Sequence, residues 1–341
     1  MGSVKDLTVI KEPDQHTTGI GRFMFSDRYS VFDWGKMPDN IADRGKALCV
    51  MGAYFFERLA KMGIRTHYLG VVEDGEPRHL SQLRSPSNCM EFKLLRVINP
   101  QKKENLYDYS TYRGEEGNFL IPLEIIYRNS LPESSSLLKR LRNGEVKPED
   151  IGLKSIPPPG EELKIPLLDV STKLEATDRY ITWDEAKEMT GFVEGEIKEI
   201  KRITLLVNEV VTKEAERIEL FNEDGKVEFG FDEFRNIVVV DVVGTPDECR
   251  FTFGGIPMCK EIARAFYRKT HWYKEIVVAK KKNRLNWKET VDVSPPLLPH
   301  RLTELISMVY RGIANEITQR VWFKNTPALK DLVYDIGNFI S

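Results

Sequence analysis

Features of membrane-spanning and disulfide-bonded proteins are absent from this sequence. No apolar run approaches the roughly 18–20 residues that a bilayer-spanning helix needs, and the first ten residues do not join a basic segment to an apolar core. Cysteine is scarce, with four residues and no C-x-x-C pair: Cys49, Cys89, Cys249 and Cys259. We therefore expect a cytoplasmic protein with reduced thiols, no secretory signal and no membrane partner.

The chain also lacks the spacings of a histidine metal site and of the common phosphate-binding loops. It has five histidines but no H-x-x-x-H or H-E-x-x-H, and neither G-x-x-x-x-G-K-[ST] nor G-x-G-x-x-G occurs. Fifty basic residues against 52 acidic ones give a net charge of −2, which argues against a general polyanion-binding protein. The three lysines at 280–282 are more typical of a solvated face than of a nucleic-acid patch. Nucleic acid is not an expected partner.

The composition is sufficient for a large folded core. Apolar residues make up 41% of the 341 residues, which suits one large domain or two closely packed lobes. Periodicity predicts strands over 22–26 and 120–128, a hairpin of 226–231 with 237–243, and helices over 46–62, 197–218 and 302–317. This mixture predicts an α+β fold in which helices pack on antiparallel sheet.

Local signals refine this outline. A capping-box sequence at Thr182 predicts a short helix that Gly191 ends, and Gly63 stands where the 46–62 helix should stop. Stretches 99–118 and 142–166 are predicted as loops, and the second is the better candidate for a linker.

The predicted hairpin carries the most informative polar residues. Lys226 and Glu228 are two positions apart on a strand, so they share a face. With a four-residue loop at 233–236, Glu228 lies opposite Asp241 and the two carboxylates converge. With a five-residue loop they fall on different faces. Converging carboxylates need a cation between them, and Mg²⁺ carrying nucleotide phosphates suits oxygen ligands. A solvated hairpin face with alternating charge is the alternative interpretation.

Two further groups of polar residues suggest an anion site. Asp247 and Arg250 follow the buried strand, where a rigid element can aim a loop, and the guanidinium of Arg250 can bind a phosphate or carboxylate. A surface ion pair of Arg250 with Asp247 or Glu248 is equally compatible with the sequence. Arg128, followed by a serine-rich stretch that includes Ser134, suits a monophosphate. A solvated connection is the alternative there.

Six segments in order along residues 26–320 resemble one enzyme family. The first three are Ser26–Asp33, similar to T-D-R-x-S-A-[FY]-D; Asp43–Lys46, similar to a G-K-G segment; and Ile121–Asn129, similar to [IV]-P-x-E-x-x-x-R. The other three are Ser171–Glu175, similar to S-T-K-x-E; Asp224–Arg250, similar to D-x-K-x-E-F-G followed by D-E-x-x-T-P-D-x-x-R; and Pro295–Pro299, similar to P-P-x-L-P. Any one match is weak, but the ordered series resembles the SAICAR synthetase family of purine biosynthesis.

The resemblance implies a fold, an activity and substrates. The fold is two-lobed α+β, with a smaller β-rich lobe over residues 1–118, a larger lobe with the C-terminal helices over 119–341, and ATP in the cleft between them. The activity is an ATP-dependent ligation, in which the carboxylate of carboxyaminoimidazole ribonucleotide becomes an acyl phosphate and the amine of L-aspartate displaces phosphate. ATP and Mg²⁺ are the implied cofactors, and the two small molecules are the implied partners. A homo-oligomer is left open.

The resemblance also implies residue roles. It assigns Lys226 and Asp247 to catalysis, and Glu228 and Asp241 to the metal ion. The residues that it assigns to the substrates are Arg128, Ser134, Arg250, Ser30, Asp33 and Lys173. The residues that we assign to the nucleotide are Lys11, Arg22, Glu124 and Lys226, although Lys11 and Arg22 are stand-ins and not motif matches.

Three departures from the family pattern concern the metal and the nucleotide. The N-terminal G-K-x-[KR] loop is not recognised, Val242 replaces an acidic residue after Asp241, and no histidine lies between Glu175 and Asp178. Two alternatives therefore stay open beside the purine-pathway ligase. One is a paralogous ligase or small-molecule kinase with another acceptor, and the other is a non-catalytic nucleotide-binding protein.

Overall fold

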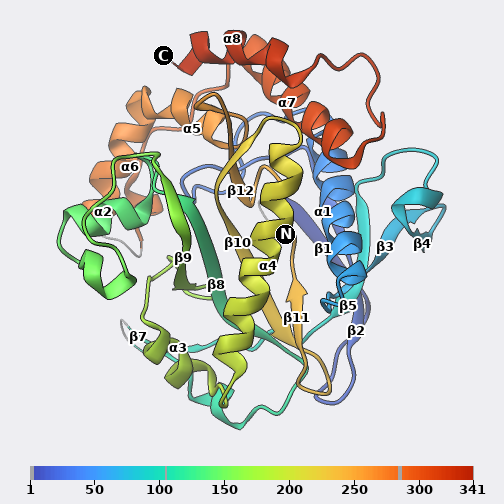
Figure 1. Ribbon diagram of the computed structural model, residues 1–341, viewed down its shortest axis with the longest axis vertical. Coiled ribbons are helices and arrows are strands. Elements are labelled where there is room, and N and C mark those ends of the chain that lie inside the picture. Colours follow the sequence, from blue (N-terminus) through green and yellow to red (C-terminus); the bar gives the residue numbers. More distant parts are fainter. Residues whose placement is uncertain (1–3, 104–105, 283–285, 341) are drawn as a thin grey trace.

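The computed structural model describes residues 4–103, 106–282 and 286–340, and builds them into two antiparallel sheets flanked by helices (Figure 1). Within these ranges, every helix is too short or too polar to span a bilayer. The predicted α+β class with antiparallel sheets is what the structure contains.

The first sheet comes from the first hundred residues. Its strand order is β1-β2-β5-β3-β4, and all neighbouring strands are antiparallel. Its strands are β1 (Lys5–Lys11), β2 (Gly19–Phe25), β3 (Tyr68–Glu73), β4 (Glu76–Arg78) and β5 (Cys89–Leu94). A separate hairpin follows, formed by β6 (Gln101–Lys103) and β7 (Leu106–Asp108). Because β1 is an edge strand, its first residue, Lys5, can reach residues outside this sheet.

The second sheet forms the centre of the molecule. Its order is β13-β12-β10-β8-β9, and β11 also pairs with β10. Its strands are β8 (Phe119–Ser130), β9 (Glu162–Thr172), β10 (Phe221–Phe231), β11 (Ile237–Val240), β12 (Cys249–Phe253) and β13 (Ile256–Pro257). On β10 the apolar Val227 and Phe229 are buried in the core and alternate with Lys226 and Glu228, so one face of the strand is apolar and the other carries charge.

Helices cover the apolar face of the second sheet and connect it to the first. They are α1 (Arg44–Lys61), α2 (Ser136–Arg142), α3 (Trp183–Thr190), α4 (Glu196–Glu216), α5 (Glu261–Arg268), α6 (His271–Lys282), α7 (His300–Thr318) and α8 (Leu329–Ile340). Figure 1 shows α4 lying across β10 and β8, with which it is in contact. The buried stripe of α4 includes Ile200, Ile203 and Val207. The charged face of β10 is therefore the face that α4 leaves uncovered.

One apolar core runs through both halves of the chain. Phe55 of α1, Phe229 of β10 and Ile313 of α7 belong to the same cluster of buried residues. The main chain of His67 also joins the two sheets, since its N–H donates to the Val239 carbonyl at 3.0 Å and its carbonyl accepts from Lys93 at 2.7 Å. The boundary at 118/119 between two lobes stays a prediction.

Most of the expected elements are present. The strands at 22–26 and 120–128 correspond to β2 and β8, and the three long helices to α1, α4 and α7. The Thr182 hydroxyl accepts from the Glu185 N–H at 3.1 Å as a cap, and Gly191 ends α3 with φ 64°. Gly63 follows α1 with φ 77°. These signals are local, which is why periodicity and capping detect them.

Two predicted loops contain structure. The 99–118 stretch holds β6, β7 and a 3₁₀ turn over Ser110–Gly114, and 142–166 contains the start of β9. Three-residue strands are too short to produce a periodic pattern. Leu153 and Leu163 of the second stretch pack on a small cluster around Leu137, so this stretch is anchored to the larger sheet.

Candidate active site

The charged face of β10 brings the predicted functional residues together. Asp224, Lys226 and Glu228 alternate along the strand, and β8 lies beside it with Glu124 opposite Glu228 and Arg128 opposite Asp224. On the other side, Arg250 of β12 is opposite Asp224. One face of three neighbouring strands thus carries carboxylates, a lysine and two arginines.

One end of this face is a cluster of three lysines and four carboxylates. The Lys226 ammonium donates to Glu228 at 2.8 Å and Glu124 at 2.9 Å, and lies 3.2 Å from Glu248. We call this group of charged residues the lysine–carboxylate cluster. Its members are Lys5, Lys173, Lys226, Glu124, Glu228, Glu248 and Asp241. Lys173 pairs with Glu228, and Lys5 with Asp241. The lysine side chains are 21–26% exposed but that of Glu228 only 3%, so the ammonium groups form the open side of the cluster.

Of the two hairpin loops that the sequence left open, the structure contains the five-residue one. Phe231 pairs with Ile237 and Glu228 with Val240, so the loop has five residues, 232–236, and Asp241 is not opposite Glu228. The Asp232 carboxylate makes the longer loop favourable, because it accepts the N–H groups of Phe234 and Asn236 at 3.0 and 2.8 Å. Asp241 nevertheless comes to the cluster, since it lies just beyond β11 at φ 61° and its carboxylate pairs with Lys5. The left-handed backbone conformation of Asp241, and not its register opposite Glu228, therefore brings its carboxylate to the cluster.

The charges of the cluster stabilise one another. Burial raises the pKa of Glu228, but Lys173 and Lys226 outweigh burial and hold it well below its usual value. Burial lowers the pKa of Lys226, and the carboxylates of Glu228, Glu248 and Glu124 raise it well above its usual value. Burial raises the pKa of Glu248 above its usual value and Asp241 adds to this rise, although Lys226 lowers it. The pKa of Lys173 is also raised, mainly by Glu228 against the effect of burial, so Lys173 and Lys226 are cationic at neutral pH and suited to contact phosphates.

The cluster contains carboxylate oxygens of the kind that coordinate a divalent cation. Glu248 Oε2 is buried and makes no hydrogen bond, although the Lys226 ammonium lies 3.2 Å from it, and four carboxylates face three ammonium groups. Oxygen ligands with excess negative charge fit Mg²⁺. The described residues contain no group of three or more acidic, histidine or cysteine side chains already arranged around a metal position. Glu228 and Asp241 are each paired with a lysine, so binding a cation requires those lysines to turn away.

The other end of the face is a chain of alternating charges that we call the arginine–aspartate network. Asp224 accepts from Arg128 at 3.1 Å and lies 3.2 Å from the Arg250 guanidinium, which donates to Ser134 at 3.1 Å. Asp169 accepts from Arg128 at 3.0 Å and also pairs with Arg140. Arg250 and Ser134 are therefore adjacent, as an anion site would need. Arg250 pairs with neither Asp247 nor Glu248.

Arg128 and Asp247 lie deeper than the sequence suggested. Arg128 is 1% exposed, and both its terminal amines are bound by Asp169, Asp224 and Ser136. The Asp247 carboxylate pairs with the buried Arg44 of α1 and accepts from the Tyr310 hydroxyl at 2.8 Å. Burial raises the pKa of Asp247, while Arg44 and Lys260 lower it below its usual value. Each of these charges is already compensated by its protein partners.

Asp33 lies in a turn with Phe32, and Ser30 precedes this turn in the chain. Asp33 is exposed, and its carboxylate accepts from the Lys280 ammonium of α6 at 2.9 Å. Ser30 is partly buried, and the structure does not bring it into either charged group of the described site. The pairing of Asp33 with Lys280 joins residues 247 positions apart and has no counterpart in the sequence pattern.

The sequence profile of SAICAR synthetase matches residues 2–255 of this chain. The chain belongs to the SAICAR synthetase family. The putative phosphoribosylaminoimidazole-succinocarboxamide synthase of Archaeoglobus fulgidus is 51% identical over 333 residues, 98% of each chain. The synthase of Thermoplasma acidophilum is 30% identical over 307 residues, 88% of this chain and 93% of its own. SAICAR synthetases are ligases that add aspartate in an ATP-dependent step of purine biosynthesis, which confirms the predicted activity.

Solved SAICAR synthetases share the fold. The enzyme of Saccharomyces cerevisiae in complex with SAICAR superposes with a TM-score of 0.61 at 20% identity, covering 93% of this chain and 96% of its own. A SAICAR synthetase (Type-2) in complex with ADP gives 0.56 at 24% identity, covering 87% and 99%. The predicted fold family is confirmed.

Lys5 was not singled out in the sequence, where Lys11 and Arg22 were the stand-ins for the N-terminal loop. Arg22 binds Glu91 at 2.7 Å and the Gly75 carbonyl at 2.8 Å, and Lys11 is exposed at the far end of β1, so neither joins the lysine–carboxylate cluster. Lys5 does, through Asp241. In the sequence, Gly2-Ser3-Val4-Lys5 keeps the first and last positions of the G-K-x-[KR] pattern. Gly2 and Ser3 lie outside the described residues.

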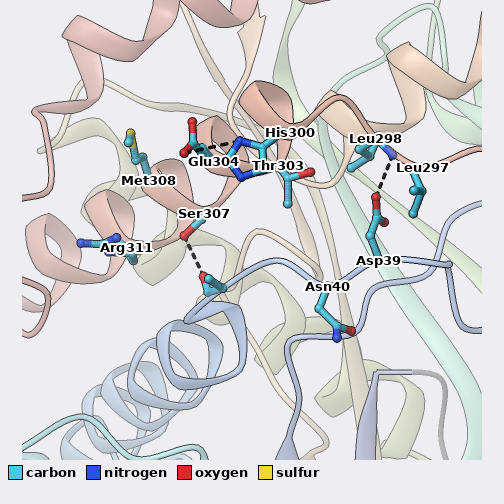
Figure 2. Close-up of a pocket in the computed structure, with 11 residues that line it drawn as sticks. Asp39, Asn40, Leu297, Leu298, His300, Thr303, Glu304, Ser307, Met308 and Arg311 are labelled. Atoms are coloured by element: carbon cyan, nitrogen blue, oxygen red, sulfur yellow. Dashed lines mark hydrogen bonds and ion pairs between the residues drawn. The ribbon is translucent and has the colours of Figure 1, made fainter.

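A cavity of about 600 Å³ lies elsewhere, between residues 39–42, Leu297–Leu298 and α7 (Figure 2). Figure 2 shows Asp39 accepting from the Leu298 N–H, which the structure places at 2.7 Å. None of the residues that we assigned to substrates, nucleotide or metal lines this cavity. It is therefore not part of the site on β10.

Proposed function

We propose that this chain catalyses the ligation on the uncovered face of β10, through an acyl phosphate. A carboxylate oxygen of carboxyaminoimidazole ribonucleotide attacks the γ-phosphorus of ATP, so that a C–O–P linkage forms and ADP leaves. The amine of L-aspartate then attacks the acyl carbon, the C–O bond to phosphate breaks, and the amine proton is released. The first step is needed because a free carboxylate is a poor electrophile.

The lysine–carboxylate cluster holds the triphosphate. Lys5, Lys173 and Lys226 turn their ammonium groups from the carboxylates toward the phosphates, which favours the charge that develops on the transferring group. Glu228, Asp241 and Glu248 then hold Mg²⁺. When bound, the ion neutralises phosphate charge and aligns the transferring group. ATP lies between the lobes, where Lys5 of the first sheet meets Asp241 of the second.

The arginine–aspartate network holds the ribonucleotide. Arg250 and Ser134 contact its phosphate, and Arg128 acts mainly through Asp224 and Asp169, because its amines are already bound. Asp247 has a positioning role, since it binds Arg44 and Tyr310 and lies just before β12, the strand that carries Arg250.

One observation carries the proposal: Glu228, Lys226 and Asp224 alternate on one strand, so the nucleotide end and the ribonucleotide end share a face. The test is ADP release measured with each substrate omitted in turn. We expect full release only with ATP, ribonucleotide and L-aspartate together. Continued ADP release over many turnovers in the absence of L-aspartate would instead identify a small-molecule kinase.

Variants test the metal end. Glu228→Gln and Asp241→Asn should each reduce turnover by at least about 100-fold, because each removes an oxygen ligand and a charge. Circular dichroism should remain that of the wild type. Turnover within threefold of wild type in a folded Asp241→Asn variant would remove Asp241 from the site.

A further inference from the structure

A buried histidine lies at the junction of the two sheets, beside the lysine–carboxylate cluster. His67, between α1 and β3, is 4% exposed, and its main chain is hydrogen-bonded to Val239 of β11 and to Lys93 of β5. Its side chain makes a further contact, because its Nε2 lies 3.2 Å from the carbonyl oxygen of Asp241. Since a carbonyl oxygen can only accept, Nε2 carries a proton and donates the hydrogen bond. His67 is thus bonded to a residue that we assign to the metal ion.

The backbone conformation of Asp241 requires such a contact. Asp241 has φ 61°, in the left-handed region that residues other than glycine rarely adopt. Its neighbours Val240 and Val242 are both buried, so the chain is anchored on either side of the turn. A strained conformation of this kind persists only where the surrounding structure holds it. The hydrogen bond from His67 holds the Asp241 carbonyl, and the left-handed conformation directs the carboxylate to the cluster.

The imidazole of His67 is itself fixed by aromatic packing. Three phenylalanine rings surround it, with centre-to-centre distances of 6.2, 5.4 and 4.7 Å for Phe23, Phe56 and Phe92. The Lys5 ammonium, which pairs with the aspartate, lies 4.4 Å from the centre of the Phe23 ring. The same aromatic group therefore contacts both the histidine and the lysine that bind this aspartate.

We propose that His67 is the positioning residue for Asp241 in the metal site. Its Nε2–H group holds the Asp241 carbonyl, and this hydrogen bond keeps the carboxylate in place for Mg²⁺. His67 acts through Asp241 and not by contact with a substrate. Replacing a residue that orients a metal ligand commonly weakens metal binding about 10- to 100-fold. The proposal rests on the proposed ligase function, in which Asp241 is a ligand of Mg²⁺.

The test is ADP binding at varied Mg²⁺ concentration, measured by isothermal titration calorimetry on the matched pair His67→Gln and His67→Met. Glutamine and methionine have similar length and volume, but only glutamine ends in an N–H donor. In His67→Met we expect the Mg²⁺ concentration at half-saturation to rise about 10-fold or more, with the affinity for metal-free ADP within about twofold of wild type. In His67→Gln both values should stay within about threefold of wild type.

A packing control separates this role from a purely structural one. Phe56→Leu removes part of the aromatic wall around the imidazole but leaves the N–H donor. It should lower the urea midpoint of unfolding and leave the Mg²⁺ dependence of ADP binding unchanged. A shift in Mg²⁺ dependence as large in Phe56→Leu as in His67→Met would overturn the proposal. Equal shifts in His67→Gln and His67→Met would overturn it too.

Asp241→Asn distinguishes failure of this proposal from failure of the ligase function. A His67→Met variant with wild-type Mg²⁺ dependence, beside an Asp241→Asn variant that needs at least about 10-fold more Mg²⁺, would exclude the role of His67 and leave the proposed function standing. Wild-type protein that binds ADP equally with and without Mg²⁺ would instead refute the metal site itself. Wild-type protein that releases no ADP with all three substrates present would refute the ligase function.

Discussion

At the scale of single residues, buried ion pairs fix the positions of the side chains that we assign to substrate binding. Asp224 is the central case, because it lies between Arg128 at 3.1 Å and Arg250 at 3.2 Å. Its side chain is 7% exposed, so neither arginine can exchange this partner for water. Asp224 therefore sets the position of the one network arginine that we assign to phosphate contact.

Replacing Asp224 by Asn should loosen Arg250 and leave the nucleotide end intact. We expect the KM for the ribonucleotide to rise about 10- to 100-fold, with the KM for ATP within twofold of wild type. Substrate-dependence assays measure both values. The control is Asp335→Asn, which removes an exposed aspartate paired with Arg301 at 2.6 Å and should change neither KM. An Asp224→Asn variant that alters only the ATP dependence would contradict this assignment.

At the scale of elements, the loop after β11 depends on close packing against α1. Gly244 has φ 74°, and a Cβ on it would lie 2.2 Å from the ring of the buried Phe55. This contact holds the segment that carries Asp241 and Asp247 against the helix. The position has no room for any other residue.

Gly244→Ala should destabilise the protein by about 2–4 kcal/mol, from overpacking plus backbone strain. Urea unfolding measures the difference. Gly255→Ala is the matched control: it has φ 84° with nothing within 4 Å, so only the strain of about 1 kcal/mol should appear. Equal losses in the two variants would show that packing on Phe55 does not matter.

The start of α5 carries a negative charge whose contribution to the free energy of unfolding depends on pH. Glu261 binds Arg264 and Arg268, each at 2.7 Å. Burial raises the pKa of Glu261, but the two arginines outweigh it and lower the pKa from 4.5 to about 2. Because the folded-state pKa is the lower one, the stabilisation is present above about pH 4.5 and is lost as pH falls toward 2.

Glu261→Gln should therefore cost up to about 3 kcal/mol at neutral pH. The gap to wild type should shrink as the pH falls below 4.5. Denaturant unfolding of both proteins at neutral pH and at about pH 3.5 checks this. A gap that stays constant over this range would mean that Glu261 acts through packing and not through its charge.

At the scale of the whole molecule, contacts between distant segments join the first 45 residues to the C-terminal helices. Ser307 of α7 donates to the Ala42 carbonyl at 2.7 Å, and the hydroxyls of Tyr29 and Tyr267 lie 2.8 Å apart. The apolar core also crosses the 118/119 boundary. The two lobes should therefore depend on each other for stability.

We predict a single unfolding transition for the intact chain. Circular dichroism and tryptophan fluorescence should give the same denaturant midpoint, since a continuous core unfolds cooperatively. A fragment of residues 1–118 should not fold alone, because α1 would expose its contact with α7. Two separated transitions would instead support two independently stable lobes.

Part of the site was predictable because it depends on short-range geometry. Lys226 and Glu228 share a face because a strand repeats every two residues, and the structure joins them at 2.8 Å. The register of Asp241 was not predictable in the same way, because one extra loop residue, favoured by the Asp232 carboxylate, shifts the whole second strand. Neither Arg128 nor Asp247 could be seen as buried, since burial depends on what packs over a residue.

The family, the α+β class and the charged residues of β10 could all be predicted from the amino-acid sequence, because ordered motifs and strand alternation are local properties. The pairing of Lys5 with Asp241 and of Lys280 with Asp33 could not, since these contacts join positions 236 and 247 residues apart. Such contacts depend on how sheets and helices pack against each other. No spacing along the chain records that packing.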